Sequence, residues 1–74
     1  MEDIEKIHTT PLGIMRIKRN LELDTDDIVS WCKKEIKKSK SKIKKGKNWY
    51  IYSENSIITI NASSYTIITA HKNK

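Results

Sequence analysis

The sequence predicts an α+β fold in which two N-terminal helices pack on one face of a three- to four-stranded antiparallel sheet. Apolar residues recur at helical spacing up to residue 38, and from residue 40 onward they alternate with polar residues. The connections between the alternating segments are short, which requires antiparallel neighbours. A chain of 74 residues has room for one domain, residues 1–74, with a thin core.

The first third of the chain contains the first helical signals. Residues 2–8 predict one or two helical turns. Thr10 followed by Pro11 is typical of an N-cap and a first helical residue, since the N–H that proline lacks has no partner there. These residues predict a helix that ends near Asn20.

A stronger start signal precedes a second helix, predicted over residues 25–38. Asp24 is expected to cap its free N–H groups, and the acidic residues that follow complement the positive end of the helix dipole. Ile28, Cys32 and Ile36 repeat at helical spacing and predict an apolar stripe toward the sheet.

The second half of the chain predicts the strands. A short charged strand over 41–45 is expected to turn at Gly46, and residues 48–53 are rich in strand-forming side chains. Two further strands, over 57–61 and 65–71, are joined by a short polar turn. Together they predict a meander that leaves one sheet face for the helices.

Alternation within the last two strands assigns their side chains to the two faces of the sheet. The face under the helices is predicted to carry Ile58, Ile60, Ile68 and Ala70. The opposite face is predicted to be polar and partly open, with Thr59, Asn61, Tyr65, Thr69 and His71, and with Ile57 and Ile67 as its apolar members.

Positive charge is concentrated in one stretch. The chain carries 15 Lys plus Arg against 9 Asp plus Glu, and residues 33–47 alone contain nine Lys and one Glu. Such a block indicates attraction to a phosphate backbone, without the base reading that arginine favours. The alternative is a solvated lysine-rich segment with no partner. The candidate nucleic-acid-binding residues are Lys37, Lys38, Lys40, Lys42, Lys44, Lys45, Lys47, Arg16 and Arg19.

Five polar residues form a candidate catalytic set, which consists of His71, Thr69, Asn61, Tyr65 and His8. Metal-independent RNA cleavage needs a base for the 2′-hydroxyl, an acid for the leaving oxygen and cations for the developing charge. Histidine suits the proton transfers because its ordinary pKa lies near neutrality. The alternative is that His71 lies at a frayed C-terminus and His8 caps a turn.

The remaining composition argues against several classes of protein. The single cysteine, Cys32, excludes an internal disulfide and is expected to be a small buried hydrophobe. Two histidines and no acidic cluster outside the N-terminal half predict no metal site, and no cofactor is expected. No apolar run is long enough to span a membrane and no signal peptide is evident, so a cytoplasmic location is expected.

Most of the chain resembles a small uncharacterised bacterial family of domains of unknown function, through the stretches IHTTPLGIMRIKRNLEL, DTDDIVSWCKK, GKNWYIY and ITINASSYTIITAHK. This resemblance implies a bacterial or phage-related origin and one fold. A looser resemblance to the RelE, barnase and colicin-type toxin nucleases rests on helices followed by a meander that ends in Thr-Ala-His. It implies catalytic side chains on the sheet face, which Thr69 and His71 match best and Asn61 and Tyr65 less well.

These observations together predict a toxin-like, metal-independent ribonuclease that binds RNA through its lysine-rich segment. The alternative is a non-catalytic nucleic-acid-binding module, or a small inhibitor of a host defence nuclease complex carried by a mobile element. The expected partner is RNA rather than DNA, or an acidic protein surface, and a homodimer is a further alternative.

Overall fold

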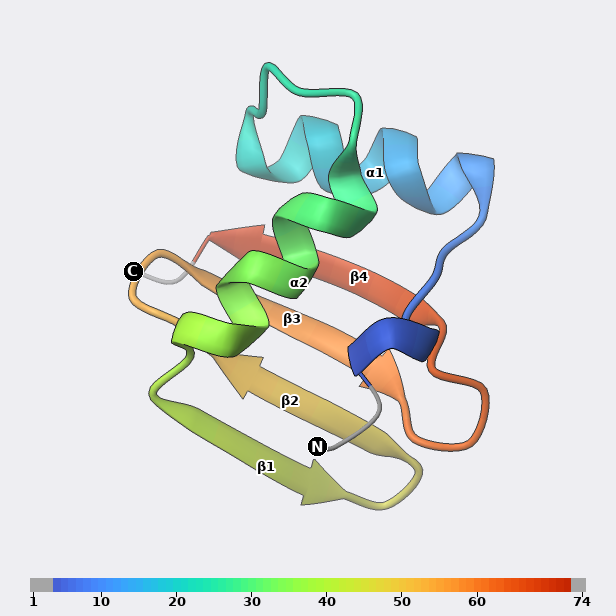
Figure 1. The fold of residues 1–74 in the computed structure, drawn as a ribbon, viewed down its shortest axis with the longest axis vertical. Helices are drawn as coiled ribbons and strands as arrows, with labels where there is room; N and C mark the ends of the chain where they lie inside the picture. The colour runs from blue at the N-terminus through green and yellow to red at the C-terminus, as the bar shows by residue number, and fades with distance from the viewer. Residues whose placement is uncertain (1–3, 73–74) are drawn as a thin grey trace.

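A computed structural model describes residues 4–72 of the chain. Its elements are η1 (Ile4–Lys6), α1 (Pro11–Leu21), α2 (Ile28–Lys38), β1 (Ser41–Lys45), β2 (Asn48–Tyr52), β3 (Ser56–Asn61) and β4 (Ile67–Lys72). The strands pair antiparallel in the order β1-β2-β3-β4. In Figure 1, α2 crosses in front of the sheet and α1 runs beside β4. The predicted α+β fold, with two helices packed on an antiparallel meander, is confirmed.

Helix α1 begins where the sequence predicts. Thr10 is its N-cap, and the Thr10 hydroxyl accepts the N–H of Gly13 at 3.0 Å. The helix ends at Leu21, and Glu22 adopts a left-handed conformation with a φ of 53°. Gly13 allows the chain before the helix to approach closely, because a Cβ at this position would lie 2.2 Å from the hydroxyl oxygen of Thr9.

The start of α2 differs from the prediction. Asp27, and not Asp24, is the N-cap, and its Oδ1 accepts the N–H of Ser30 at 3.2 Å. Asp24 is exposed in the connection before the helix, and Asp26 pairs with Lys18 of α1. Three aspartates within four residues offer equivalent cap chemistry, and the one directly before the apolar stripe takes the role.

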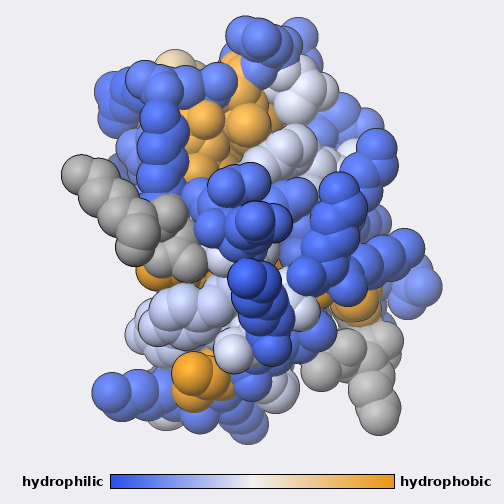
Figure 2. All heavy atoms as spheres, turned by 90° about the vertical axis from the view of Figure 1, so that its left-hand side faces the viewer, coloured by the Kyte–Doolittle hydropathy of each residue, from blue (hydrophilic) through white to orange (hydrophobic). Residues whose placement is uncertain are grey.

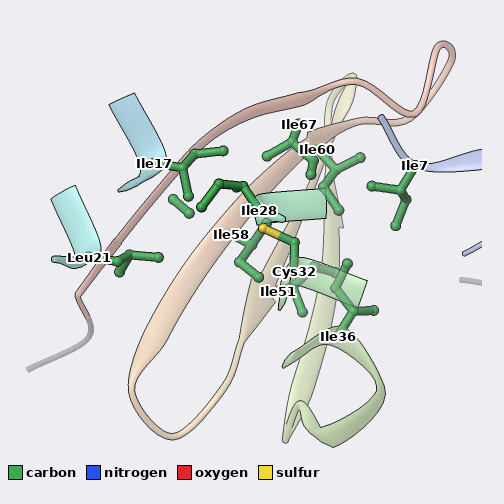
Figure 3. Close-up of a cluster of buried hydrophobic side chains, with 11 residues drawn as sticks. Ile7, Ile17, Leu21, Ile28, Cys32, Ile36, Ile51, Ile58, Ile60 and Ile67 are labelled. Carbon is green, nitrogen blue, oxygen red and sulfur yellow. The ribbon is translucent and has the colours of Figure 1, made fainter. Parts of the chain in front are cut away.

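Isoleucine fills most of the space between the helices and the sheet, as the close-up in Figure 3 shows. The helices cover β2, β3 and β4, whereas all five residues of β1 are exposed. The core therefore stops one strand short of the sheet edge. The buried apolar residues are Ile7, Ile17, Leu21, Ile28, Cys32, Ile36, Ile51, Ile58, Ile60, Ile67 and Ala70.

An irregularity in β4 changes which isoleucine is buried. Thr59 pairs with Thr69, but the next residue of β3, Ile60, pairs with Ile67, so that Ile68 is skipped. An extra residue of this kind breaks the strict alternation of faces. Ile67 is accordingly 2% exposed and Ile68 43% exposed. The predicted assignment of Ile68 to the covered face and of Ile67 to the open face is therefore wrong.

The two edges of the sheet differ in how they are covered. The N-terminal segment runs beside β4, where the N–H of Ile67 donates to the carbonyl of His8 at 2.8 Å. The Thr9 hydroxyl donates to the carbonyl of Ile67 at 3.1 Å, and Asn20 Nδ2 donates to another β4 carbonyl at 3.3 Å. At the opposite edge, no segment within residues 4–72 pairs with the outer side of β1.

Candidate nucleic-acid interface

Seven lysines surround the uncovered strand β1. All seven are exposed, and none of them forms an ion pair with another residue between positions 4 and 72. They come from the end of α2, the connection that follows it, β1 itself and the turn after β1. We refer to them as the lysine edge, which consists of Lys37, Lys38, Lys40, Lys42, Lys44, Lys45 and Lys47.

The register of β1 on β2 distributes these lysines over both sides of the sheet edge. Gly46 begins the two-residue turn between the strands with a φ of 64°, a conformation that glycine adopts without strain. Lys42 lies opposite the buried Ile51, so Lys42 and Lys44 project on the helix side. Lys45 projects on the open side. The edge is therefore positively charged in every exposed direction.

Acidic side chains gather at the other end of the molecule, in the connection between α1 and α2. In Figure 1 this connection lies at the top and β1 at the bottom. The hydrogen bond and the positive charge of Lys18 lower the pKa of Asp26, and those of Lys72 lower the pKa of Glu22. Acid at one end and unpaired lysine at the other create a directional field that attracts polyanions.

The open sheet face beside the lysine edge is aromatic and hollowed. Tyr50 and Tyr52 of β2 are half-buried there, and Ile43 of β1 is 50% exposed. Ile43 and Tyr52 line two shallow hollows, one extending toward Lys40 and the other toward Lys45. In Figure 2 the lower part of the molecule, at the height of β1, is hydrophilic apart from one small hydrophobic spot. Rings next to lysines are what a single nucleic-acid strand needs for base stacking and phosphate neutralisation.

A second polar group lies where β3 joins β4. His8 Nε2 is 3.1 Å from the Thr66 hydroxyl oxygen, which is 2.8 Å from that of Ser64. The Ser64 hydroxyl oxygen also lies 3.2 Å from Asn61 Oδ1. We refer to His8, Asn61, Ser64 and Thr66 as the His8 cluster.

One contact decides the tautomer of His8. Its Nδ1 lies 2.9 Å from the carbonyl oxygen of Lys6, and a carbonyl can only accept a hydrogen bond. The neutral ring therefore keeps its proton on Nδ1, and Nε2 accepts the hydroxyl hydrogen of Thr66. This is the arrangement of a general base held in one orientation.

The His8 cluster and the lysine edge lie at the same end of the sheet. The N–H of Ala62 donates to the carbonyl of Lys47 at 2.8 Å, which joins the β3–β4 loop to the β1–β2 turn. Lys45 pairs with Asn48, and Asn48 pairs with Asn61. With strands about 4.8 Å apart, Asn61 in β3 lies roughly 10 Å from β1, and His8, one spacing beyond β4, lies roughly 19 Å from it.

The structure brings together two of the five residues predicted to be catalytic, His8 and Asn61. Tyr65 is half-buried against the core in the β3–β4 loop, with a φ of 58°. Thr69 and His71 lie further along β4, on the open face. His71 is five residues beyond the loop position that contacts His8, so roughly 15 Å separates the two histidines. Ser64 and Thr66, which complete the cluster, are not among the residues that the sequence singled out.

Arg16 and Arg19 lie apart from the lysine edge. They share the exposed side of α1 with Leu12 and Met15, around a shallow groove. Because α1 runs beside β4, the width of the sheet separates these arginines from β1. A few nucleotides of RNA bound at the lysine edge therefore do not reach Arg16 and Arg19.

Cys32 is not placed to react. Burial, together with the nearby charge of Glu35, raises the pKa of its thiol to about 12, so almost no thiolate exists at neutral pH. Between residues 4 and 72, no three side chains of His, Cys, Asp or Glu are grouped to hold a metal ion. Over the same range, neither helix has the length and apolar character needed to cross a membrane.

Fold and surface together define a small two-layer α+β protein with one basic, uncovered sheet edge. A family model described as "Protein of unknown function (DUF3781)" matches residues 1–71, and the chain belongs to this family. The resemblance to an uncharacterised family of domains of unknown function is thereby confirmed. A search of curated proteins and a search of solved structures each found no significant match.

Proposed function

We propose that the protein binds single-stranded RNA across the lysine edge and the adjoining open sheet face. The observation that supports this most strongly is the set of seven exposed, unpaired lysines beside the rings of Tyr50 and Tyr52. Lysine neutralises phosphate without reading bases, and tyrosine rings stack on any base, so the binding has little sequence preference.

Single-stranded RNA suits this surface better than a duplex. The tyrosine rings lie on a sheet face rather than on a protruding element, and the bases of a duplex are already stacked on one another. We place this function in the cytoplasm, because the reducing conditions there keep a free thiol such as that of Cys32 reduced.

Binding is expected to depend steeply on salt. If about four phosphates are neutralised, the logarithm of the association constant falls with the logarithm of salt concentration at a slope of about −3. Raising potassium chloride from 50 to 200 mM then weakens binding of a fluorescently labelled 12-nucleotide RNA roughly 60-fold. Fluorescence anisotropy measures this directly. A flat salt response, or no binding at the lowest salt, contradicts the proposal.

The His8 cluster favours a second candidate function, metal-independent RNA cleavage of the toxin-nuclease type. An RNA 2′-hydroxyl that replaces the Thr66 hydroxyl at His8 Nε2 would give up its proton there. The 2′-oxygen would attack the adjacent phosphorus, and the 5′-oxygen would leave with a proton from a lysine or from water. The product would be a cyclic phosphate.

Cleavage in EDTA distinguishes the two histidines. We expect His8→Ala to slow cleavage of total RNA at least about 100-fold, because a general base contributes that much. His71→Ala is the matched control, since His71 is exposed on β4 and lies outside the His8 cluster. Loss of cleavage only in His71→Ala would return the catalytic role to His71. No cleavage by the unaltered protein rules out this second function.

A further inference from the structure

The outer side of β1 presents backbone N–H and C=O groups that no strand within residues 4–72 pairs with. In an antiparallel pair, alternate residues of a strand direct their N–H and C=O groups to the partner and the others direct them away. Among the described residues β1 pairs with β2 alone, and all five residues of β1 are exposed. The N-terminal segment, Thr9 and Asn20 cover the β4 edge, whereas no segment between residues 4 and 72 covers β1 in this way.

The side chains of β1 disfavour a second copy of the chain as the partner. An antiparallel pairing of two β1 strands centred on Ile43 sets Lys42 against Lys44 twice, and like charges directly opposite one another are destabilising. Lysine on an edge strand is a common protection against edge-to-edge association. The same lysines favour a strand of opposite charge.

We propose that β1 binds an extended acidic peptide segment, which adds a fifth strand to the sheet. Two of its residues would lie beside Lys42 and Lys44 on the helix side, where aspartate or glutamate fits. The residue between them would lie beside Ile43 on the open side, where a β-branched apolar side chain fits. The recognised pattern is acidic–apolar–acidic in an extended conformation, which is β-strand addition with charge complementarity.

This inference shares Lys42 and Lys44 with RNA binding, but it also requires the outward N–H and C=O groups of β1, which binding of a phosphate backbone does not require. The two proposals therefore fail separately. Strand addition forms hydrogen bonds with the backbone of every second residue of the peptide. Simple charge attraction forms no such backbone hydrogen bonds, so it does not distinguish one set of alternate residues from the other.

The test compares three blocked six-residue peptides of sequence Thr-Glu-Val-Glu-Thr-Glu. One is unmodified, and the other two carry N-methyl groups on alternate residues, at the odd or at the even positions. We expect one methylated isomer to bind at least tenfold more weakly than the other, because only one set of N–H groups faces β1. Chemical-shift titration of the ¹⁵N-labelled protein measures the affinities and locates the contact at β1. Equal affinity of the two isomers, or no binding of the unmodified peptide, overturns the inference.

A fourth peptide tests the charge requirement. Replacing its three glutamates by glutamine keeps the strand-forming pattern and removes the ion pairs with the lysines. We expect this peptide to bind about tenfold more weakly than the unmodified one at low salt. Unchanged affinity would overturn the assignment of an acidic partner.

Discussion

Ile58→Ala is expected to lower the free energy of unfolding by about 2–5 kcal/mol, as for other buried large-to-small substitutions. Ile58 is fully buried in the inner strand β3, between Ile51 of β2 and Ala70 of β4. The space that it leaves cannot be filled by neighbours held in the sheet. A chain of 74 residues has a total stability of roughly 4–11 kcal/mol, so this substitution removes a large part of it. Urea denaturation followed by circular dichroism gives the difference.

Ile57→Ala provides the matched control, since it makes the same chemical change one position earlier. Ile57 lies half-buried on the open face, opposite Tyr52 and His71. Its truncation is expected to cost about 1 kcal/mol or less, because little apolar area returns to water. Equal losses from the two substitutions would mean that the assignment of sheet faces is wrong.

The sequence predicts the elements well where their signals are local. The Thr10 cap and the proline after it act within one turn, so the start of α1 is confirmed. Strict alternation correctly buries Ile58, Ile60 and Ala70. Alternation does not locate the irregularity in β4, because that irregularity occurs where β4 contacts residues distant in the sequence. The N-terminal segment pairs with Ile67 there, and Thr9 bonds the same residue.

The candidate sites divide in the same way. Lysines in a polar strand are exposed wherever the strand lies, so the sequence locates the lysine edge. The serines after Asn61 form a local turn, in which Asn61 Oδ1 accepts the N–H groups of Ser63 and Ser64 at 2.9 Å. The sequence does not show that His8 lies beside Thr66, because the two residues are 58 positions apart. Only the parallel bridge between the N-terminal segment and the start of β4 makes that contact.

Reversing the charge of three lysines in β1 is expected to weaken RNA binding about 100-fold or more at 100 mM salt. The variant is Lys42→Glu, Lys44→Glu, Lys45→Glu, which removes three phosphate contacts and adds three repulsive charges. The slope of affinity against salt should flatten by about 2, since each lost contact contributes about 0.7. All three side chains are exposed and outside the core, so the fold should persist. Anisotropy with the labelled RNA measures both effects.

A comparison variant distinguishes the effect of the lysine edge on RNA binding from the effect of net charge alone. Arg16→Glu, Lys18→Glu, Arg19→Glu makes the same charge change on α1, which lies beside the opposite edge strand β4, and brings the formal net charge of +6 to zero just as the first variant does. At 100 mM salt the Debye length is about 10 Å, so charges on the far side of the sheet act weakly on RNA bound at β1. We expect this variant to lose less than about tenfold in affinity. If both variants weaken binding equally, the attraction belongs to the whole surface and the lysine edge has no special role in it.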